Sequence, residues 1–205
     1  MKYIRVSEIL ARLQDFSHVD VDVLTAKQKL GCQVHHAITE DAQGMFPLLE
    51  TPRAASYFSS YLLWKRDVKP LYKMQETRLY DDELRITGQI DALIGMGNGS
   101  CRLVDWKCSA NISEEIWMMQ AHFYWYLLRQ NKIDVSTNFE WVNLRSKKVI
   151  EGYDEEGAPI ITYHPLKPRC LKFDFQQNIL SRCLDEAIKA WEEKKTEELV
   201  DFNAY

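Results

Sequence analysis

Residues 85–126 constrain the fold more than any other stretch, because two apolar runs in them are each interrupted by charge. The first run, ITGQIDALI, contains Asp91, and the second, CRLVDWK, contains Asp105 and Lys107. A Gly97-Asn98-Gly99 turn signal lies between them. A charge inside an apolar run is costly to bury unless an opposite charge or a metal ion accompanies it. The stretch therefore predicts a β-hairpin whose charges meet a metal ion or a substrate.

Hydrophobic periodicity along the rest of the chain predicts an α/β domain. Helical spacing predicts helices at residues 24–39, 53–65, 113–130 and 178–199, and a short helix capped by Ser7. Alternating patterns predict strands at residues 75–80, 84–96, 100–107 and 138–144. Residues 145–159 read as a turn-rich excursion, and a short strand at 160–164 is expected to stop at Pro165 and Pro168. We expect one domain on a mixed central sheet, residues 1–205, with a motif core at about 27–145 and peripheral additions at 1–26 and 146–205.

Charge and cysteine usage narrow the classes of function. A formal net charge of −4 and a pI near 5.8 exclude a broad basic face, so any surface that binds phosphates must be local. Candidate cations are Lys65, Arg66, Lys69, Lys73, Arg78, Arg85, Arg145, Lys147 and Lys148. The five cysteines form no CxxC pair, which favours reduced thiols over a zinc site or a disulfide framework. Without an apolar leader, a cytoplasmic protein is expected.

Asp105 and Lys107 are two residues apart on a predicted strand, so both side chains point to one face of the sheet. Asp91, on the neighbouring strand, can lie beside Asp105. Two carboxylates and a lysine suit a hard divalent cation, which lowers the pKa of a bound water and polarises a phosphoryl oxygen. A structural Asp–Lys ion pair on an exposed sheet face is the alternative.

Gln120 and Tyr124 are four residues apart on the helix that follows, so they share one helix face. A buried glutamine needs hydrogen-bond partners, and the end of the sheet beside the charged residues can supply them. The alternative is a glutamine at the solvent edge and a tyrosine in the core.

An earlier helix carries the adjacent histidines His35 and His36 behind Gly31. Adjacent helical residues face about 100° apart, so at most one of the two can reach a shared metal ion. A glycine in a helix interior costs about 1 kcal/mol relative to alanine. Either the helix begins near Gly31, or something approaches its backbone closely there.

Together these segments resemble the PD-(D/E)XK nuclease superfamily, in its RecB-like and lambda-type exonuclease branch. Five features match in the family's order: a GxxxH helix at residues 31–35, a strand glutamate at Glu76, GxID at residues 88–91, DxK at residues 105–107, and QxxxY at residues 120–124. The resemblance covers about residues 6–128 and implies a restriction-endonuclease-like core with a mixed central sheet flanked by helices.

The resemblance implies a role for each matching residue. Asp91, Asp105, His35 and the backbone carbonyl of Trp106 become ligands of Mg²⁺ or Mn²⁺. Lys107 becomes the base or the group that orients the water, and it is counted as catalytic together with Asp91, Asp105 and Gln120. Gln120 and Tyr124 position the lysine and the DNA. His36 followed by Glu40 is the alternative histidine ligand. The cysteine spacing does not match members that carry a cluster, so no iron–sulfur cluster is expected.

The function implied is that of a metal-dependent DNA exonuclease acting on linear ends, single- or double-stranded, in phage or mobile-element recombination, DNA repair or end processing. The implied partners are DNA and, as a further candidate, a recombinase or single-strand-binding protein, with no membrane and a host-cytoplasmic location for a phage protein. The alternatives are a catalytically silent DNA-binding or assembly module and a structure-specific endonuclease.

Overall fold

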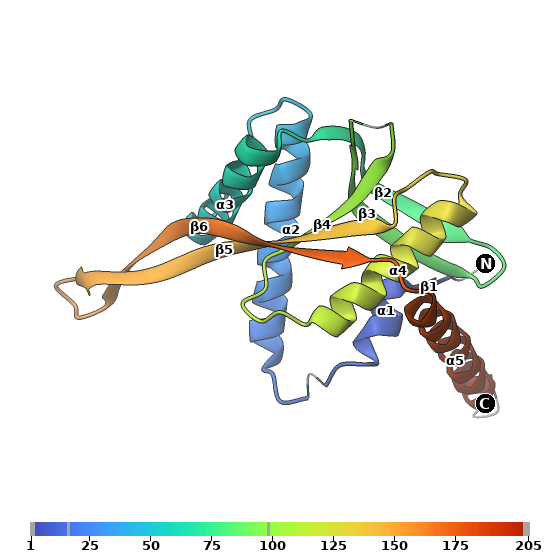
Figure 1. Cartoon of the computed structure of the whole chain (residues 1–205). Coiled ribbons are helices and arrows are strands. Elements are labelled where there is room, and N and C mark those ends of the chain that lie inside the picture. The colour runs from blue at the N-terminus through green and yellow to red at the C-terminus, as the bar shows by residue number, and fades with distance from the viewer. Residues whose placement is uncertain (1–2, 16, 98, 203–205) are drawn as a thin grey trace.

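A computed structural model describes residues 3–15, 17–97 and 99–202, and it has a mixed central sheet between two layers of helices (Figure 1). The strands are β1 (Ile4–Arg5), β2 (Leu71–Asp81), β3 (Ile86–Gly95), β4 (Cys101–Lys107), β5 (Asn138–Tyr153) and β6 (Pro159–Asp174). The helices are α1 (Val6–Ala11), α2 (Val21–Ala42), α3 (Pro52–Val68), α4 (Glu114–Gln130) and α5 (Gln177–Phe202). The predicted α/β class with a mixed sheet is confirmed.

The sheet follows the order β1-β3-β4-β5-β6, and β2 also pairs with β3. β2, β3 and β4 form the predicted antiparallel meander. Asn98 of the predicted turn between β3 and β4 lies outside the described residues. β4 and β5 are parallel, and α4 provides the crossover between them.

Each face of the sheet has its own hydrophobic core. Helices α1, α4 and α5 cover one face, where Ile90 and Leu103 pack against Phe123. Helices α2 and α3 cover the other, where Val104 and Trp106 pack against their apolar side chains. Because side chains alternate along β4, Asp105 and Lys107 lie on the α4 side, and Trp106 lies on the α2–α3 side.

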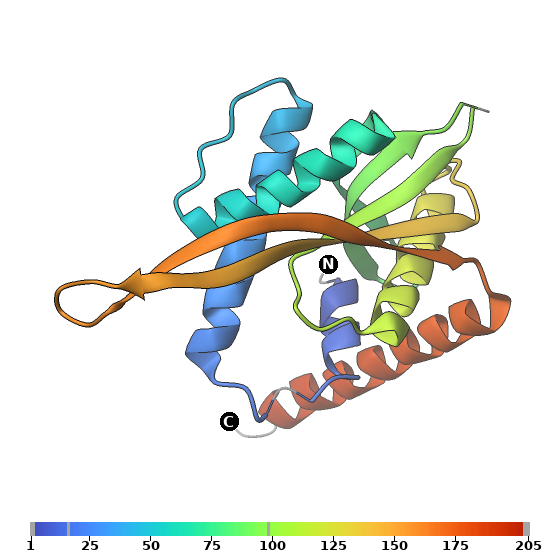
Figure 2. The same ribbon diagram turned by 60° about the vertical axis from the view of Figure 1, so that its left-hand side comes forward.

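β5 and β6 form a long antiparallel hairpin whose outer part extends beyond the rest of the molecule (Figures 1 and 2). The predicted turn-rich excursion and the predicted stop at the prolines are both wrong. Among the described residues β6 pairs only with β5, so it is an edge strand, where proline is tolerated because no partner needs its N–H. Pro165 faces Ser146 in the ladder, and Pro168 falls in a register shift.

Two details of the predicted helices differ from the structure. α1 starts at Val6 with Arg5 as its N-cap, so Ser7 is inside the helix, and Glu8 accepts from the Arg5 amide instead. α2 starts at Val21, where the side chain of Asp20 caps it, and runs straight through Gly31. Apart from its chain neighbours and the backbone of its own helix, no atom of the described residues lies within 4 Å of a Cβ placed on Gly31. Neither a helix start nor a close protein contact therefore explains this glycine.

No helix among the described residues is both long enough and apolar enough to cross a membrane.

Candidate active site

The site forms where β3 and β4 separate. Their antiparallel ladder ends at the pair Ala92–Val104, one residue short of the two aspartates. Beyond that pair, Oδ2 of Asp91 accepts a hydrogen bond of 2.7 Å from the Trp106 amide. A side-chain carboxylate thus takes the place of a backbone carbonyl, which keeps Asp91 buried and points its other oxygen out of the sheet.

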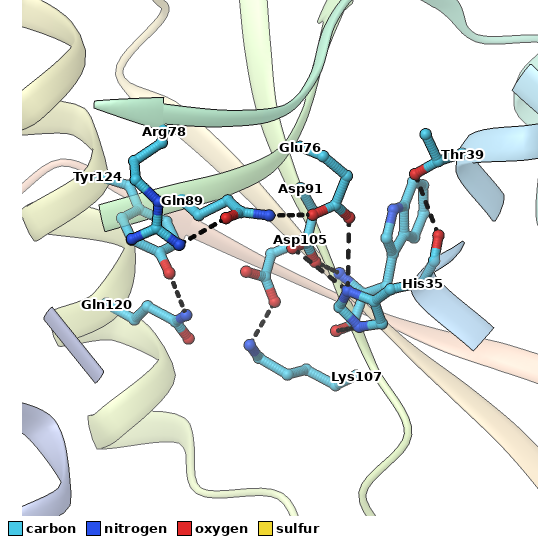
Figure 3. A network of polar contacts seen from close by, with 11 residues as sticks. His35, Thr39, Glu76, Arg78, Gln89, Asp91, Asp105, Lys107, Gln120 and Tyr124 are labelled. Carbon is cyan, nitrogen blue, oxygen red and sulfur yellow. Dashed lines mark hydrogen bonds and ion pairs between the residues drawn. The ribbon is translucent and has the colours of Figure 1, made fainter. Parts of the chain in front are cut away.

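His35 reaches this point from α2, and both of its ring nitrogens face acceptors (Figure 3). Nδ1 lies 3.4 Å from Asp91 and 3.8 Å from Glu76, and Nε2 lies 3.1 Å from the Trp106 carbonyl oxygen. Burial is the largest single influence and lowers the pKa of His35, but the charge and hydrogen bond of Asp91, together with the charge of Asp105, outweigh it and raise the pKa to about 9. His35 is therefore an imidazolium at neutral pH when no cation is bound.

Glu76 is the third member of this group, and its backbone is in the left-handed region with a φ of 43°. Such a conformation is uncommon for a residue other than glycine and often marks a functional position. Gln89 donates to Glu76 (2.5 Å), and Arg78 donates to Gln89 (2.7 Å). Burial and then the charge of Asp91 raise the pKa of Glu76 above its usual range. The polar chain from Arg78 holds the carboxylate toward His35.

Asp105 is 1% exposed and forms an ion pair with Lys107 on the α4 side of the sheet. Its Oδ2 makes this charge contact but accepts no hydrogen bond of good geometry among the described residues. Burial, and then the charge of Asp91, raise the pKa of Asp105 above its ordinary range, and Lys107 opposes this rise. Asp105 is buried and Lys107 is half-buried, so the alternative of an ion pair on an exposed sheet face is wrong.

Gln120 and Tyr124 lie on the face of α4 that is turned toward Asp105 and Lys107 (Figure 3). Gln120 Nε2 donates to the Tyr124 hydroxyl at 2.9 Å. Burial and then the charges of Asp105 and Asp91 raise the pKa of Tyr124. A Cβ on Gly88 would lie 2.8 Å from the tyrosine ring, so glycine is required there for α4 to approach β3.

Asn143, which sequence reasoning missed, supports the end of β4. It is buried and stands opposite Lys107 in the parallel ladder. With its amide nitrogen turned toward the neighbouring carbonyls, it donates to the backbone oxygens of Lys107 (3.1 Å) and Ser109 (3.0 Å). No local sequence signal marks this role, because the pairing of β4 with β5 is non-local.

An open cleft of about 790 Å³ leads to these groups from the α2 side. It is lined by Ser7, Gln28, Gly31, Cys32, His35, His36, Thr39, Glu76, Gln89 and Asp91. One ligand atom from each of His35, Glu76 and Asp91 lies within 4.8 Å of the others, close enough to share one cation. Two carboxylates and an imidazole suit Mg²⁺ or Mn²⁺, and the carboxylate of Asp105, paired here with Lys107, is a further hard donor nearby.

The structure brings together most of the residues predicted from the sequence. His35, Asp91 and the Trp106 carbonyl meet directly, whereas Asp105 contacts Lys107. The side chain of His36 is 74% exposed and pairs with Glu40 at 3.3 Å, away from this group. Glu76 was noted in the sequence only as a strand glutamate, and Gln89 was missed. The period-two pattern could have found Gln89, because it shares a strand face with Asp91.

The six-stranded mixed sheet flanked by helices is a nuclease-like fold. It is similar to the crystal structure of an alkaline exonuclease, LHK-Exo, from Laribacter hongkongensis, with a TM-score of 0.51 and 10% sequence identity over 98% of this chain and 93% of that one. At this identity the likeness establishes the fold alone.

Two further solved structures are more distant. The complex of LHK-Exo with dAMP matches with a TM-score of 0.45 and 11% identity, over 98% of this chain and 93% of that one. A structure of SSO0001 matches with a TM-score of 0.37 and 10% identity, over 93% and 76%. No protein-family model and no curated protein sequence matches the chain.

Proposed function

We propose that the protein is a divalent-metal-dependent deoxyribonuclease that degrades linear DNA from its ends. The observation that carries the proposal is the meeting of His35, Glu76 and Asp91 beside the ion pair of the buried Asp105 with Lys107, next to an open cleft. This arrangement stands on a fold similar to that of an alkaline exonuclease.

His35, Glu76 and Asp91 would hold the cation, with Asp105 and the Trp106 carbonyl as the further ligands proposed. A bound Mg²⁺ or Mn²⁺ supplies Lewis-acid polarisation of a phosphoryl oxygen and a water of lowered pKa. The negative side chains repel the phosphates of DNA, so the charge of the cation is also what admits the substrate.

Lys107 lies on the α4 side of this group, where its ammonium contacts Asp105. In the reaction we assign to it the orientation of the attacking water and the stabilisation of charge on the phosphoryl oxygens. Gln120 and Tyr124, joined by their hydrogen bond, limit the space open to the lysine and to the DNA backbone. A water held by Lys107 in line with the scissile bond gains from proximity and orientation.

The test is cleavage of end-labelled linear DNA, single- and double-stranded, and of closed circular DNA, with Mg²⁺ or Mn²⁺. We compare the wild type with Lys107→Ala and Asp105→Asn, using Lys132→Ala as the matched control, since Lys132 is exposed and follows the C-terminal end of α4. Loss of a group that transfers or orients a proton lowers the rate by about 10²–10⁴. We expect that loss in both site variants and none in the control.

The outcomes separate the alternatives. Equal cleavage by all four proteins would show that Asp105 and Lys107 do not belong to an active site. Cleavage of the circle at the same rate as the linear substrate makes the protein an endonuclease. DNA binding that survives EDTA, with no cleavage in either metal, favours the catalytically silent module.

A further inference from the structure

A second hollow lies between α3 and the base of the β5–β6 hairpin, across α2 from the catalytic cleft. It has a volume of about 170 Å³ and is lined by Arg53, Tyr57, Ser146, Lys148 and Tyr163. A wider depression of about 350 Å³ shares Arg53 and Tyr163 with it and continues onto α2. In Figure 2 the hairpin passes in front of α2 and α3 at this point.

The lining has the composition of a site for an anion. Arg53 and Lys148 are exposed, and neither forms an ion pair within the part of the chain that the structure describes. Tyr57 is only 5% exposed, yet its hydroxyl has no hydrogen-bond partner among the described residues, and it lines the hollow. Because the residue lines the hollow and its hydroxyl is not sealed from solvent, that hydroxyl is free to donate to a ligand there.

The charges around the hollow are separated along the hairpin. Lys148 shares a strand face with Ser146 toward the hollow, Arg145 and Lys147 alternate to the other face, and Glu151 and residues 154–156 place the acids toward the tip. Glu50, which lines the adjacent depression, is paired with Lys29 at 3.8 Å and with Gln33. The base of the hairpin is therefore a local cationic surface on a protein of net charge −4.

The hollow is also close to the active site. Gly31 and Cys32 of α2 line the catalytic cleft, while the neighbouring Leu30 and Gln33 line the depression next to the hollow.

We propose that this hollow binds one backbone phosphate of the DNA strand, at a fixed distance from the scissile phosphate. The proposal rests on the proposed function, because it takes DNA as the substrate. Arg53 and Lys148 supply the charge, and Tyr57 donates its free hydroxyl to a phosphate oxygen. Contacts of this kind set the register of the strand and read no base sequence.

The test measures the affinity of fluorescein-labelled DNA in EDTA, so that binding does not depend on cleavage. The double variant Arg53→Gln/Lys148→Gln is compared with Lys132→Gln/Lys195→Gln, which removes the same charge from two exposed lysines elsewhere. Loss of hydrogen bonds to a charged group predicts an affinity about tenfold lower or more for the site variant, beyond any change in the control. Loss of one phosphate contact lowers the slope of log K against log salt by about 0.7–0.9.

A single neutral methylphosphonate, moved along the DNA one position at a time, identifies the phosphate. We expect one position at which the double variant and the wild type bind with the same affinity, because the contact is already missing there. Tyr57→Phe removes only the hydroxyl and should weaken binding of unmodified DNA about two- to tenfold. With the methylphosphonate at the same position, Tyr57→Phe and the wild type should bind with equal affinity.

Two results overturn the inference: a double variant that binds like the control pair, or a loss of affinity that is the same at every methylphosphonate position. Cleavage by the wild type with Mg²⁺ is scored separately. If the wild type cleaves DNA but the double variant binds DNA normally, the proposed function stands and the phosphate site in the hollow is rejected. If the position-specific effect is seen but the wild type cleaves no DNA, the phosphate site in the hollow stands and the proposed function is rejected.

Discussion

Replacing Gly31 with alanine should stabilise the protein and at the same time impair its use of DNA. Gly31 lies in the interior of α2, and a Cβ placed there meets no atom within 4 Å. Alanine is favoured over glycine in a helix interior by about 1 kcal/mol. For a chain of this size, about 1 kcal/mol corresponds to a rise in Tm of about 2–4 °C.

The loss of function follows from the position of Gly31 in the cleft. Because it lines the cleft and no protein group approaches it, we infer that the glycine leaves room for the substrate strand. The added methyl group should raise KM for linear DNA and leave kcat nearly unchanged, since no atom of Lys107 lies within 4 Å of it. The assays are thermal unfolding without DNA and metal, and steady-state cleavage with Mg²⁺.

Gly88→Ala is the matched control, because the same substitution there should lower the stability of the protein instead of raising it. Its new Cβ would lie 2.8 Å from the Tyr124 ring and 2.9 Å from Leu127 Cδ1. Overpacking of this kind costs about 1–3 kcal/mol. A lower Tm for Gly31→Ala would refute the assignment of an unconstrained helix interior. A higher Tm with unchanged KM would show that the substrate strand does not approach Gly31 closely.

Two further predictions concern the cation site. Mn²⁺ affinity should rise about tenfold per pH unit up to about pH 9. His35 has a pKa of about 9 in the metal-free protein, and only the neutral imidazole can coordinate a cation, so its proton must be lost on binding. At pH 7.5, removing that proton costs about 2 kcal/mol; a flat titration from pH 6.5 to 9.5 would exclude His35 as a ligand. Glu76→Asn should stabilise the metal-free protein by up to about 1 kcal/mol, because asparagine tolerates a left-handed backbone, and should weaken Mn²⁺ binding. Calorimetry measures both effects, and unaltered Mn²⁺ affinity would contradict the ligand role of Glu76.

Local patterns were sufficient to predict the centre of the molecule. β3, β4 and α4 are close in sequence and contact one another, so their periodicity and turn signals predicted both the elements and their pairing. The spacing of Asp105 and Lys107 predicted a shared face, because strand geometry alone determines it. The same local reasoning failed at residues 145–168, because the tolerance of an edge strand for proline depends on which strand lies beside it.

The sequence by itself determined the mixed α/β architecture, the paired strands that carry the acids, and the residue types available for a metal site. Only the tertiary structure decided that His35 rather than His36 meets the acids, that Glu76 joins them in a strained conformation, and that Asn143 supports Lys107. It also formed the hollow between α3 and the β5–β6 hairpin. The physical reason is that these contacts join segments distant in the chain, and the orientation of a helix over a sheet is decided by packing across the whole core.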